Sequence, residues 1–76
     1  MQELVEYLVK ALVDEPDAVK VDVIDIGGAM TYEVTVAEND LGKVIGRQGR
    51  IANALRTVVK AAALKTGERV SLEIVS

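Results

Sequence analysis

The chain has 76 residues, half of them hydrophobic, with a net charge of −3 and a pI of about 4.8. This length corresponds to one domain near the lower size limit for a self-sufficient core, and the hydrophobic content excludes intrinsic disorder. Cysteine and histidine do not occur, which excludes disulfides, the common zinc sites and Cys/His or Ser/His nucleophile systems. No apolar run is long enough to cross a membrane, and Glu3 and Glu6 interrupt any signal-peptide core.

The first half of the chain predicts a helix followed by two paired strands. Apolar residues recur at helical spacing over residues 4–13, and Pro16 should end this helix because proline cannot continue it. β-Branched residues then predict a strand over residues 19–26, and strict alternation predicts a second strand over residues 31–36. The Gly27-Gly28 link between them favours an antiparallel hairpin.

Two finer features are expected in this half. The apolar phase changes at Val23–Ile24, which predicts a β-bulge in the first strand. Tyr7 and Tyr32 lie on the apolar faces of their elements, so both are expected in the core. They are the only aromatic residues, so the chain cannot build the stacking platform on which RRM and OB-fold proteins bind bases.

The second half predicts two helices around a glycine-containing loop. Asn39 or Asp40 can cap a short helix that ends at Ile45. A longer helix is expected over residues 50–66, with Gly67 as the residue that follows its end. Its expected core stripe, read at helical spacing, is Ile51, Leu55, Val58, Val59 and Ala62.

A third strand over residues 70–74 completes the order α-β-β-α-α-β. No repeat, linker or low-complexity segment interrupts the chain, so residues 1–76 are expected to form a single domain. We therefore expect an α+β fold in which three helices cover one face of a three-stranded sheet.

The charges are divided along the chain. Residues 1–40 carry ten acids and two bases, whereas residues 41–67 carry six bases and no acid. An anionic partner responds to the field within about one Debye length, about 8 Å at physiological salt, more than to the total charge. The basic segment is therefore a candidate for binding nucleic acid, although a solvated helix face is the competing interpretation.

Gly46-Arg47-Gln48-Gly49 lies between the two helices of the basic segment. Two glycines at this spacing are common by chance and are also typical of a plain corner between helices. Here, free backbone N–H groups at a helix start favour a phosphate, and glycines without Cβ permit close approach of a sugar-phosphate chain. Lys43 and Arg50 add charge on both sides, which a purely structural corner does not need.

The stretch GKVIGRQGRIANALR resembles the signature of the KH domain, whose helix–GxxG–helix clamps about four nucleotides of single-stranded RNA or DNA by the backbone. Together with EPDAVKVDV and the short Gly-Gly link, it resembles the small bacterial single-KH proteins of the KhpA type, with a type II KH-like fold. The resemblance implies a cytoplasmic protein that binds single-stranded RNA. It also implies a homodimer or a pairing with a larger KH-containing protein, and post-transcriptional regulation linked to cell elongation and division.

The resemblance also implies which residues bind RNA. The clamp would be Gly46, Arg47, Gln48 and Gly49, with Lys43 and Arg50 beside it. The adjoining groove, between the two helices and an edge of the sheet, would be lined by Leu41, Val44, Ile45 and Ile51. Many KH motifs place a bulky aliphatic residue where this chain has Ala52, so Ile51 and Leu55 are expected to supply that packing.

One side of the long helix is the expected contact surface of a dimer. At 100° per residue, Leu64 falls opposite the predicted core stripe, where small residues allow close approach. The predicted interface is Ala54, Thr57, Ala61 and Leu64. Alternatively, Leu64 is one of the scattered exposed apolar residues that are normal on a protein surface, or it packs against the segment after Gly67 and closes the helix end. A dimer would offset the weakness of one four-nucleotide site by raising the effective concentration of the second.

Two other classes of function are compared with RNA binding. A protein-interaction module that keeps the KH scaffold is the main alternative, but it has no need of Lys43, Arg47 and Arg50 around two glycines. A small enzyme is disfavoured because the sequence offers no candidate acid–base pair or nucleophile. No metal, no cofactor and no membrane partner are expected.

Overall fold

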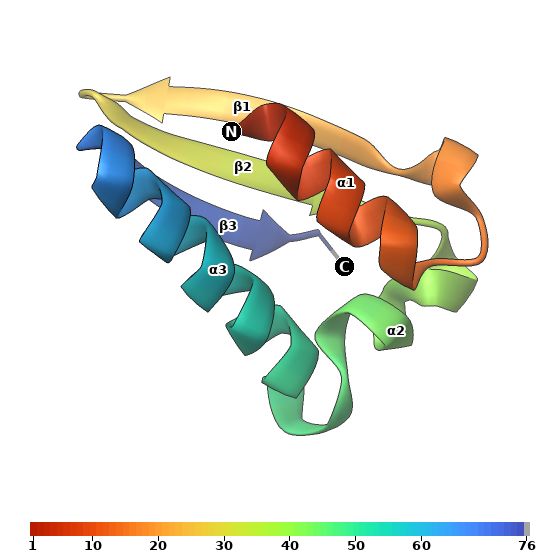
Figure 1. Ribbon diagram of the computed structural model, residues 1–76. Coiled ribbons are helices and arrows are strands. Elements are labelled where there is room, and N and C mark those ends of the chain that lie inside the picture. Colours follow the sequence, from red (N-terminus) through yellow and green to blue (C-terminus); the bar gives the residue numbers. More distant parts are fainter. Residues whose placement is uncertain (76) are drawn as a thin grey trace.

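The computed structural model describes residues 1–75, in which helices cover one face of a three-stranded sheet (Figure 1). The elements are α1 (Gln2–Leu12), β1 (Lys20–Ile26), β2 (Ala29–Thr35), α2 (Leu41–Ile45), α3 (Arg50–Thr66) and β3 (Arg69–Ile74). Short 3₁₀ turns lie at Pro16–Ala18, Glu38–Asp40 and Arg47–Gly49. The predicted order and the α+β fold are confirmed. Within residues 1–75, every helix is too short or too polar to cross a membrane.

β2 lies in the middle of the sheet, antiparallel to β1 and parallel to β3. Gly27 and Gly28 form the predicted hairpin turn with φ of 59° and 86°, since a tight two-residue turn of this kind needs positive φ at both positions. Each residue of β1 faces one residue of β2 along the whole ladder, so the predicted bulge at Val23–Ile24 is wrong. The phase change instead leaves Ile24 and Ile26 on the face that the helices do not cover.

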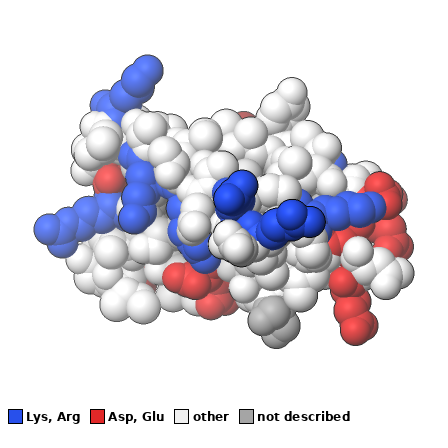
Figure 2. All heavy atoms as spheres, turned by 90° about the horizontal axis from the view of Figure 1, so that it is seen from below, with Lys and Arg blue, Asp and Glu red and all other residues white. Residues whose placement is uncertain are grey.

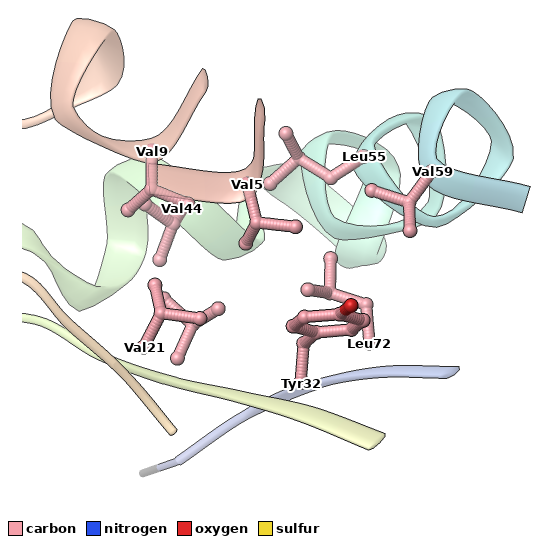
Figure 3. Close-up of a cluster of buried hydrophobic side chains, with 9 residues drawn as sticks. Val5, Val9, Val21, Tyr32, Val44, Leu55, Val59 and Leu72 are labelled. Carbon is pink, nitrogen blue, oxygen red and sulfur yellow. The ribbon is translucent and has the colours of Figure 1, made fainter. Parts of the chain in front are cut away.

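The core lies between the helices and the sheet and consists mainly of valines (Figure 3). Side chains from all three helices and all three strands meet there, namely Val5, Val9, Val21, Tyr32, Val34, Val44, Leu55, Val59 and Leu72. Tyr32 is buried as predicted, but Tyr7 is 72% exposed, so its predicted place in the core is wrong. The buried residues of α1 are Val5 and Val9. Tyr7 falls halfway between them in sequence and therefore on the opposite side of the helix.

α3 packs along β3 with a core stripe that differs from the predicted one. Its buried residues are Ala52, Leu55, Val59 and Ala63. Val58, which was expected in the core, is 47% exposed and lies beside α1. The small Ala52 and Ala63 allow α3 to lie close to the sheet, and Ile51 packs against the edge of the core. The predicted stripe was therefore placed too far round the helix, towards α1.

The end of α3 follows the prediction. Gly67 has φ of 72°, and its N–H donates to Leu64 O at 3.3 Å. The N–H of Glu68 donates to Ala63 O at 3.0 Å, which completes a Schellman motif. This tight reversal returns the chain directly into β3.

Candidate nucleic-acid interface

The glycine loop between α2 and α3 is held by its backbone and leaves its side chains free. The N–H of Gly46 donates to Gly42 O at 2.9 Å, and the N–H of Gly49 donates to Gly46 O at 3.2 Å. Arg47 and Gln48 are exposed, and their backbone N–H groups take part in neither bond. The loop therefore offers two amides next to two polar side chains at the start of α3.

The two glycines of the loop are needed for different physical reasons. Gly46 has φ 74° and ψ 175°, a conformation that only glycine adopts readily. A Cβ atom on Gly46 would also lie 2.6 Å from Cγ1 of Ile51. Gly49 has φ 74° and ψ 16°, and a Cβ atom there would meet only the side chain of Asn53, at 4.0 Å. Packing and conformation fix Gly46, whereas conformation alone favours glycine at position 49.

Of the three predicted RNA-binding cations, two are exposed at the surface and one is paired with acids. Arg47 and Arg50 are exposed. Lys43 forms an ion pair with Asp14 and lies with its Nζ 3.7 Å from Oδ1 of Asp40. The hydrogen bond to Asp14, together with the charges of both carboxylates, raises the pKa of Lys43 in spite of its partial burial. The charge of Lys43 is thus balanced within the protein, and we expect it to attract an anion less than Arg47 does.

Asp40 joins the start of α2 to the chain that follows α1. It is 1% exposed, and its two carboxylate oxygens accept hydrogen bonds from the N–H groups of Asp14, at 3.2 Å, and Glu15, at 3.0 Å. Burial opposes ionisation, but these amides and Lys43 outweigh it and hold the pKa of Asp40 below its ordinary value. Asp40, one of the two predicted capping residues, occupies the N-cap position of α2, but its side chain bonds to the chain after α1 and makes no capping bond.

The predicted groove residues divide into surface and core positions. Leu41, Ile45 and Ile51 are half-buried and pack against the core, so part of each side chain stays accessible. Val44 is fully buried, and its predicted place in the groove lining is wrong. One side of the short α2 faces the core and the other faces solvent, and Val44 lies on the core side.

In the described residues β3 is an edge strand of the sheet, and α3 packs against it. Arg56 of α3 reaches this edge, with its Nε donating to Leu72 O at 3.1 Å. Its Nη1 donates to Asn53 Oδ1 at 3.0 Å. No sequence pattern marked Arg56 among the six bases of its segment, because its role depends on which side of α3 meets β3.

Many basic side chains lie on the face that carries the loop and α3. Figure 2 shows this face, where Lys and Arg side chains cross the middle and Asp and Glu lie mainly towards one end and the lower rim. On the open face of the sheet, Asp22, Glu33 and Glu73 stand in one row across the three strands. An anionic chain is repelled from that open face and attracted to the loop face.

The predicted dimer residues all lie on the solvent side of α3. Ala54, Thr57, Ala61 and Leu64 are exposed. Leu64 is 80% exposed, so the segment after Gly67 does not cover it. The alternative in which Leu64 closes the helix end is therefore wrong.

In chemical terms, the site combines backbone amides, guanidinium groups and aliphatic surface around one loop. These groups suit a polyanion whose backbone approaches closely. Within residues 1–75, no three potential metal ligands of the His, Cys, Asp or Glu type come together.

Comparison with known proteins identifies relatives along the whole domain. Residues 2–74 match the family model of the KhpA/KhpB KH domain. The RNA-binding protein KhpA of Caldanaerobacter subterraneus subsp. tengcongensis is 57% identical over 75 residues, which cover 99% of this chain and 100% of that protein. The RNA-binding protein KhpA of Borreliella burgdorferi is 51% identical over 72 residues, which cover 95% of this chain and 88% of that protein.

A solved structure shares the fold. Era in complex with MgGDPNP and nucleotides 1506–1542 of 16S ribosomal RNA matches with a TM-score of 0.70 and 22% identity. The match covers 96% of this chain and 28% of the Era chain. This likeness, at low identity, shows a common α+β architecture.

Proposed function

This chain belongs to the KhpA/KhpB KH-domain family, and we propose that it binds single-stranded RNA through the backbone of residues 46–49. The loop carries the proposal, since the amides of Arg47 and Gln48 are not used within it and both side chains are exposed. A phosphate placed there gains from the positive end of the α3 dipole and from Arg50. The relatives named RNA-binding protein KhpA support the same class of ligand.

The proposed function is binding rather than catalysis. Half-buried Leu41, Ile45 and Ile51 next to the loop offer an aliphatic surface on which bases can lie, in place of aromatic stacking. Following the family resemblance, we place this function in the cytoplasm, in post-transcriptional regulation linked to cell elongation and division. A protein-interaction module on the same scaffold is the alternative, and it leaves the basic loop without a role.

The direct test replaces the two exposed loop residues by aspartate. The variant Arg47→Asp/Gln48→Asp should lose binding to a fluorescein-labelled oligouridine, measured by anisotropy, while its thermal unfolding midpoint changes little. Acids at a helix start suit the dipole, so the fold is not expected to suffer. Tyr7→Asp/Lys10→Asp is the matched control, because it makes the same charge change at two exposed positions of α1. Wild-type affinity in the loop variant would refute the clamp. An equal loss of affinity in the control would show that net charge, and not the loop, explains the binding.

The salt dependence of binding gives the size of the contact. One clamp with its neighbours touches three or four phosphates, so log K against log salt should have a slope of about −2 to −3 for a single strand. Affinity per domain should be weak because the contact is short. Tight binding by an isolated domain that does not respond to salt would contradict a phosphate clamp.

We also propose that α3 pairs two copies, or one copy with a larger KH-containing protein. The proposed surface is Ala54, Thr57, Ala61 and Leu64. Small side chains allow two helices to approach around a two-fold axis, and Leu64, 80% exposed, gives the apolar contact. Pairing would join two weak RNA sites and raise the effective concentration of the second.

Sedimentation tests the pairing and the surface separately. Wild type should sediment as a dimer at micromolar concentrations, and Leu64→Glu as a folded monomer. Asn39→Glu is the control, since it adds the same charge at an exposed position outside α3. A monomeric wild type would rule out the homodimer. A Leu64→Glu variant that stays dimeric and folded would rule out this surface as the interface.

A further inference from the structure

β1 forms one edge of the sheet, whereas α3 packs against β3 at the other edge. In residues 1–75 the strand order is β1-β2-β3, so no strand pairs with the outer side of β1. Figure 1 shows that β1 runs on past the start of α1 towards the hairpin. Val21 is the one buried residue of this strand, and residues 22–26 are all exposed. The second half of β1 is therefore an open strand edge.

The hydrogen bonds of β1 show which backbone groups this edge offers. Nε2 of Gln2 donates to Val21 O at 3.0 Å, so that carbonyl points away from β2. In an antiparallel ladder, residues bonded to the neighbouring strand alternate with residues whose backbone groups point outward. Val23 and Asp25 therefore point their N–H and C=O groups outward, as Val21 does. Among residues 1–75, the backbone bonds outside helices and ladders use neither of them, so both are available to an added strand.

The side chains along this edge combine apolar and acidic character. Ile24 and Ile26 are exposed on the open face of the sheet, where β-branched side chains of an added strand would pack against them. Asp22 stands in one row with Glu33 and Glu73 of the next two strands. A residue added opposite Asp22 would therefore lie at the end of a row of carboxylates.

This charge favours a cationic peptide over the other chains that fit a strand edge. A second copy would bring Asp22 and Asp25 of one strand beside the same acids of the other, and like charges in paired strands are destabilising. RNA is repelled by the same acidic row. Nζ of Lys20 lies 4.0 Å from Oδ2 of Asp22, but both side chains are exposed, and such a pair is too weak to cancel the row.

We propose that the outer edge of β1, over residues 22–26, binds an extended cationic segment of another protein as an additional antiparallel strand. Main-chain hydrogen bonds to Val23 and Asp25 supply the affinity, and alternate side chains supply the specificity. The segment carries Lys or Arg opposite Asp22 and a β-branched residue opposite Ile24. This surface lies at the other edge of the sheet from β3 and does not depend on the proposed RNA-binding function, so the chain would hold RNA and a protein partner together.

The test titrates the ¹⁵N-labelled full chain with the peptide acetyl-Thr-Thr-Lys-Val-Thr-Lys-Thr-amide and follows the backbone amides by NMR. The signals of Val23 and Asp25 should shift, and at saturation these amides should exchange with solvent about tenfold more slowly. The amide of Ile24, which faces β2, should be protected with or without the peptide. A peptide with Glu in place of both lysines should produce neither effect.

Two matched pairs separate strand addition from attraction by charge alone. N-methylation of the peptide at the two amides that face Val23 and Asp25 should weaken binding about tenfold or more, whereas N-methylation at the valine and the second lysine, whose N–H groups point to solvent, should leave it. This pair uses the unaltered protein, so it remains decisive even where a variant fails to fold. Asp22→Lys should also weaken binding about fivefold or more. Asp17→Lys, which makes the same charge change at an exposed acid outside β1, should weaken it much less.

Several results would overturn the proposal. Amides of Val23 and Asp25 that do not respond to millimolar peptide would mean that the edge takes no strand. Protection of these amides in wild type without peptide would assign the edge to a second copy, and the same shifts with oligouridine would assign it to RNA. Equal binding of the two N-methylated peptides, or equal losses in Asp22→Lys and Asp17→Lys, would reduce the interaction to attraction by charge.

Discussion

α2 has only five residues, and its two ends are built in opposite ways. At its start, Asp40 is buried and accepts hydrogen bonds from the backbone N–H groups of Asp14 and Glu15. At its end, the N–H groups of Arg47 and Gln48 are not used within an exposed loop. At the first end a carboxylate of the chain already occupies an anion site made of two amides. We propose that an RNA phosphate occupies the corresponding site at the second end.

We call the start of α2, where Asp40 is bonded, its closed end, and the glycine loop that follows α2 its open end. The closed end fixes the position of the open end. A helix of five residues has almost no stability of its own. α2 is held by the Asp40 bonds at its start and by Val44, which is fully buried between the other elements. The glycine loop therefore emerges at a fixed place beside α3, although none of its side chains is packed as tightly as Val44. Substitutions at the two ends should accordingly have different consequences for folding and for RNA.

The largest effect is expected for Gly46→Ala, which breaks the open end by steric means. The new Cβ atom would lie 2.6 Å from Cγ1 of Ile51, in a backbone conformation that alanine avoids. We expect a loss of about 3 kcal/mol in the free energy of unfolding, measured by urea denaturation, from backbone strain and overpacking together.

Gly42→Ala is the matched control for that experiment. Gly42 lies inside α2, and nothing within 4 Å would meet its Cβ atom. Alanine should therefore stabilise the helix by about 0.5–1 kcal/mol. Equal stability of wild type and Gly46→Ala would show that the approach of Ile51 does not constrain the loop.

A smaller effect at neutral pH, with a marked pH dependence, is expected for Asp40→Asn at the closed end. The pKa of Asp40 is lowered in the folded protein, so its stabilisation is present above the unfolded pKa of about 4 and is lost as the pH falls through the folded value. Asp40→Asn should be less stable than wild type at pH 7, and the difference should shrink below about pH 4.

Urea midpoints measured at several pH values would check this. Asp17→Asn, at an exposed acid on the same connection, should follow the wild-type curve. Parallel pH profiles for wild type and Asp40→Asn would mean that the carboxylate does not stabilise the junction through its charge.

A third substitution, Gly49→Ala, tests the cost of the left-handed backbone conformation in a place where the new side chain meets no steric obstacle. Gly49 is left-handed, and its surroundings leave room for a Cβ atom. We expect a loss of about 1–2 kcal/mol in unfolding free energy, the usual cost of this conformation for a residue with Cβ. Gly49→Asn should lose less, because asparagine tolerates the left-handed region. A Gly49→Ala loss as large as that of Gly46→Ala would contradict the distinction between the two glycines.

The features that sequence predicted correctly depend on neighbours along the chain. Helical spacing, strand alternation, the Gly27-Gly28 turn and the Gly67 terminus are all local signals, and the structure confirms them. Family resemblance added the type II KH-like fold. The loop residues could be named because glycine spacing and charge lie in one short stretch.

The features that sequence missed depend on contacts between distant elements. Asp40 meets amides about 25 positions earlier in the chain, so its local sequence suggested only a helix cap. Arg56 acquires a role only because α3 lies against β3. Val58 was misplaced because helical spacing does not say which of two adjoining sides faces the core. Tyr7 was misplaced although helical spacing itself puts it on the side of α1 opposite Val5 and Val9. The corrections at Asp40, Arg56 and Val58 thus concern contacts between elements, whereas those at Tyr7 and Val23–Ile24 concern the placement of residues within one element.

The smallest effect on stability is expected at Gln48, where a substitution tests how much one side chain of the glycine loop contributes to RNA binding. Gln48 is the one residue other than glycine with positive φ in residues 1–75, at φ 56° and ψ 26°. Gln48→Gly relieves about 1 kcal/mol of strain but adds nearly as much freedom to the unfolded chain, so stability should change by less than about 0.5 kcal/mol. Binding of the oligouridine should nevertheless weaken, since the amide side chain beside the clamp is lost. Gln48→Asn, which keeps an amide and tolerates this conformation, should retain more affinity than Gln48→Gly. Equal affinities of wild type and Gln48→Gly would mean that the loop binds RNA through its backbone and Arg47, without the side chain of Gln48.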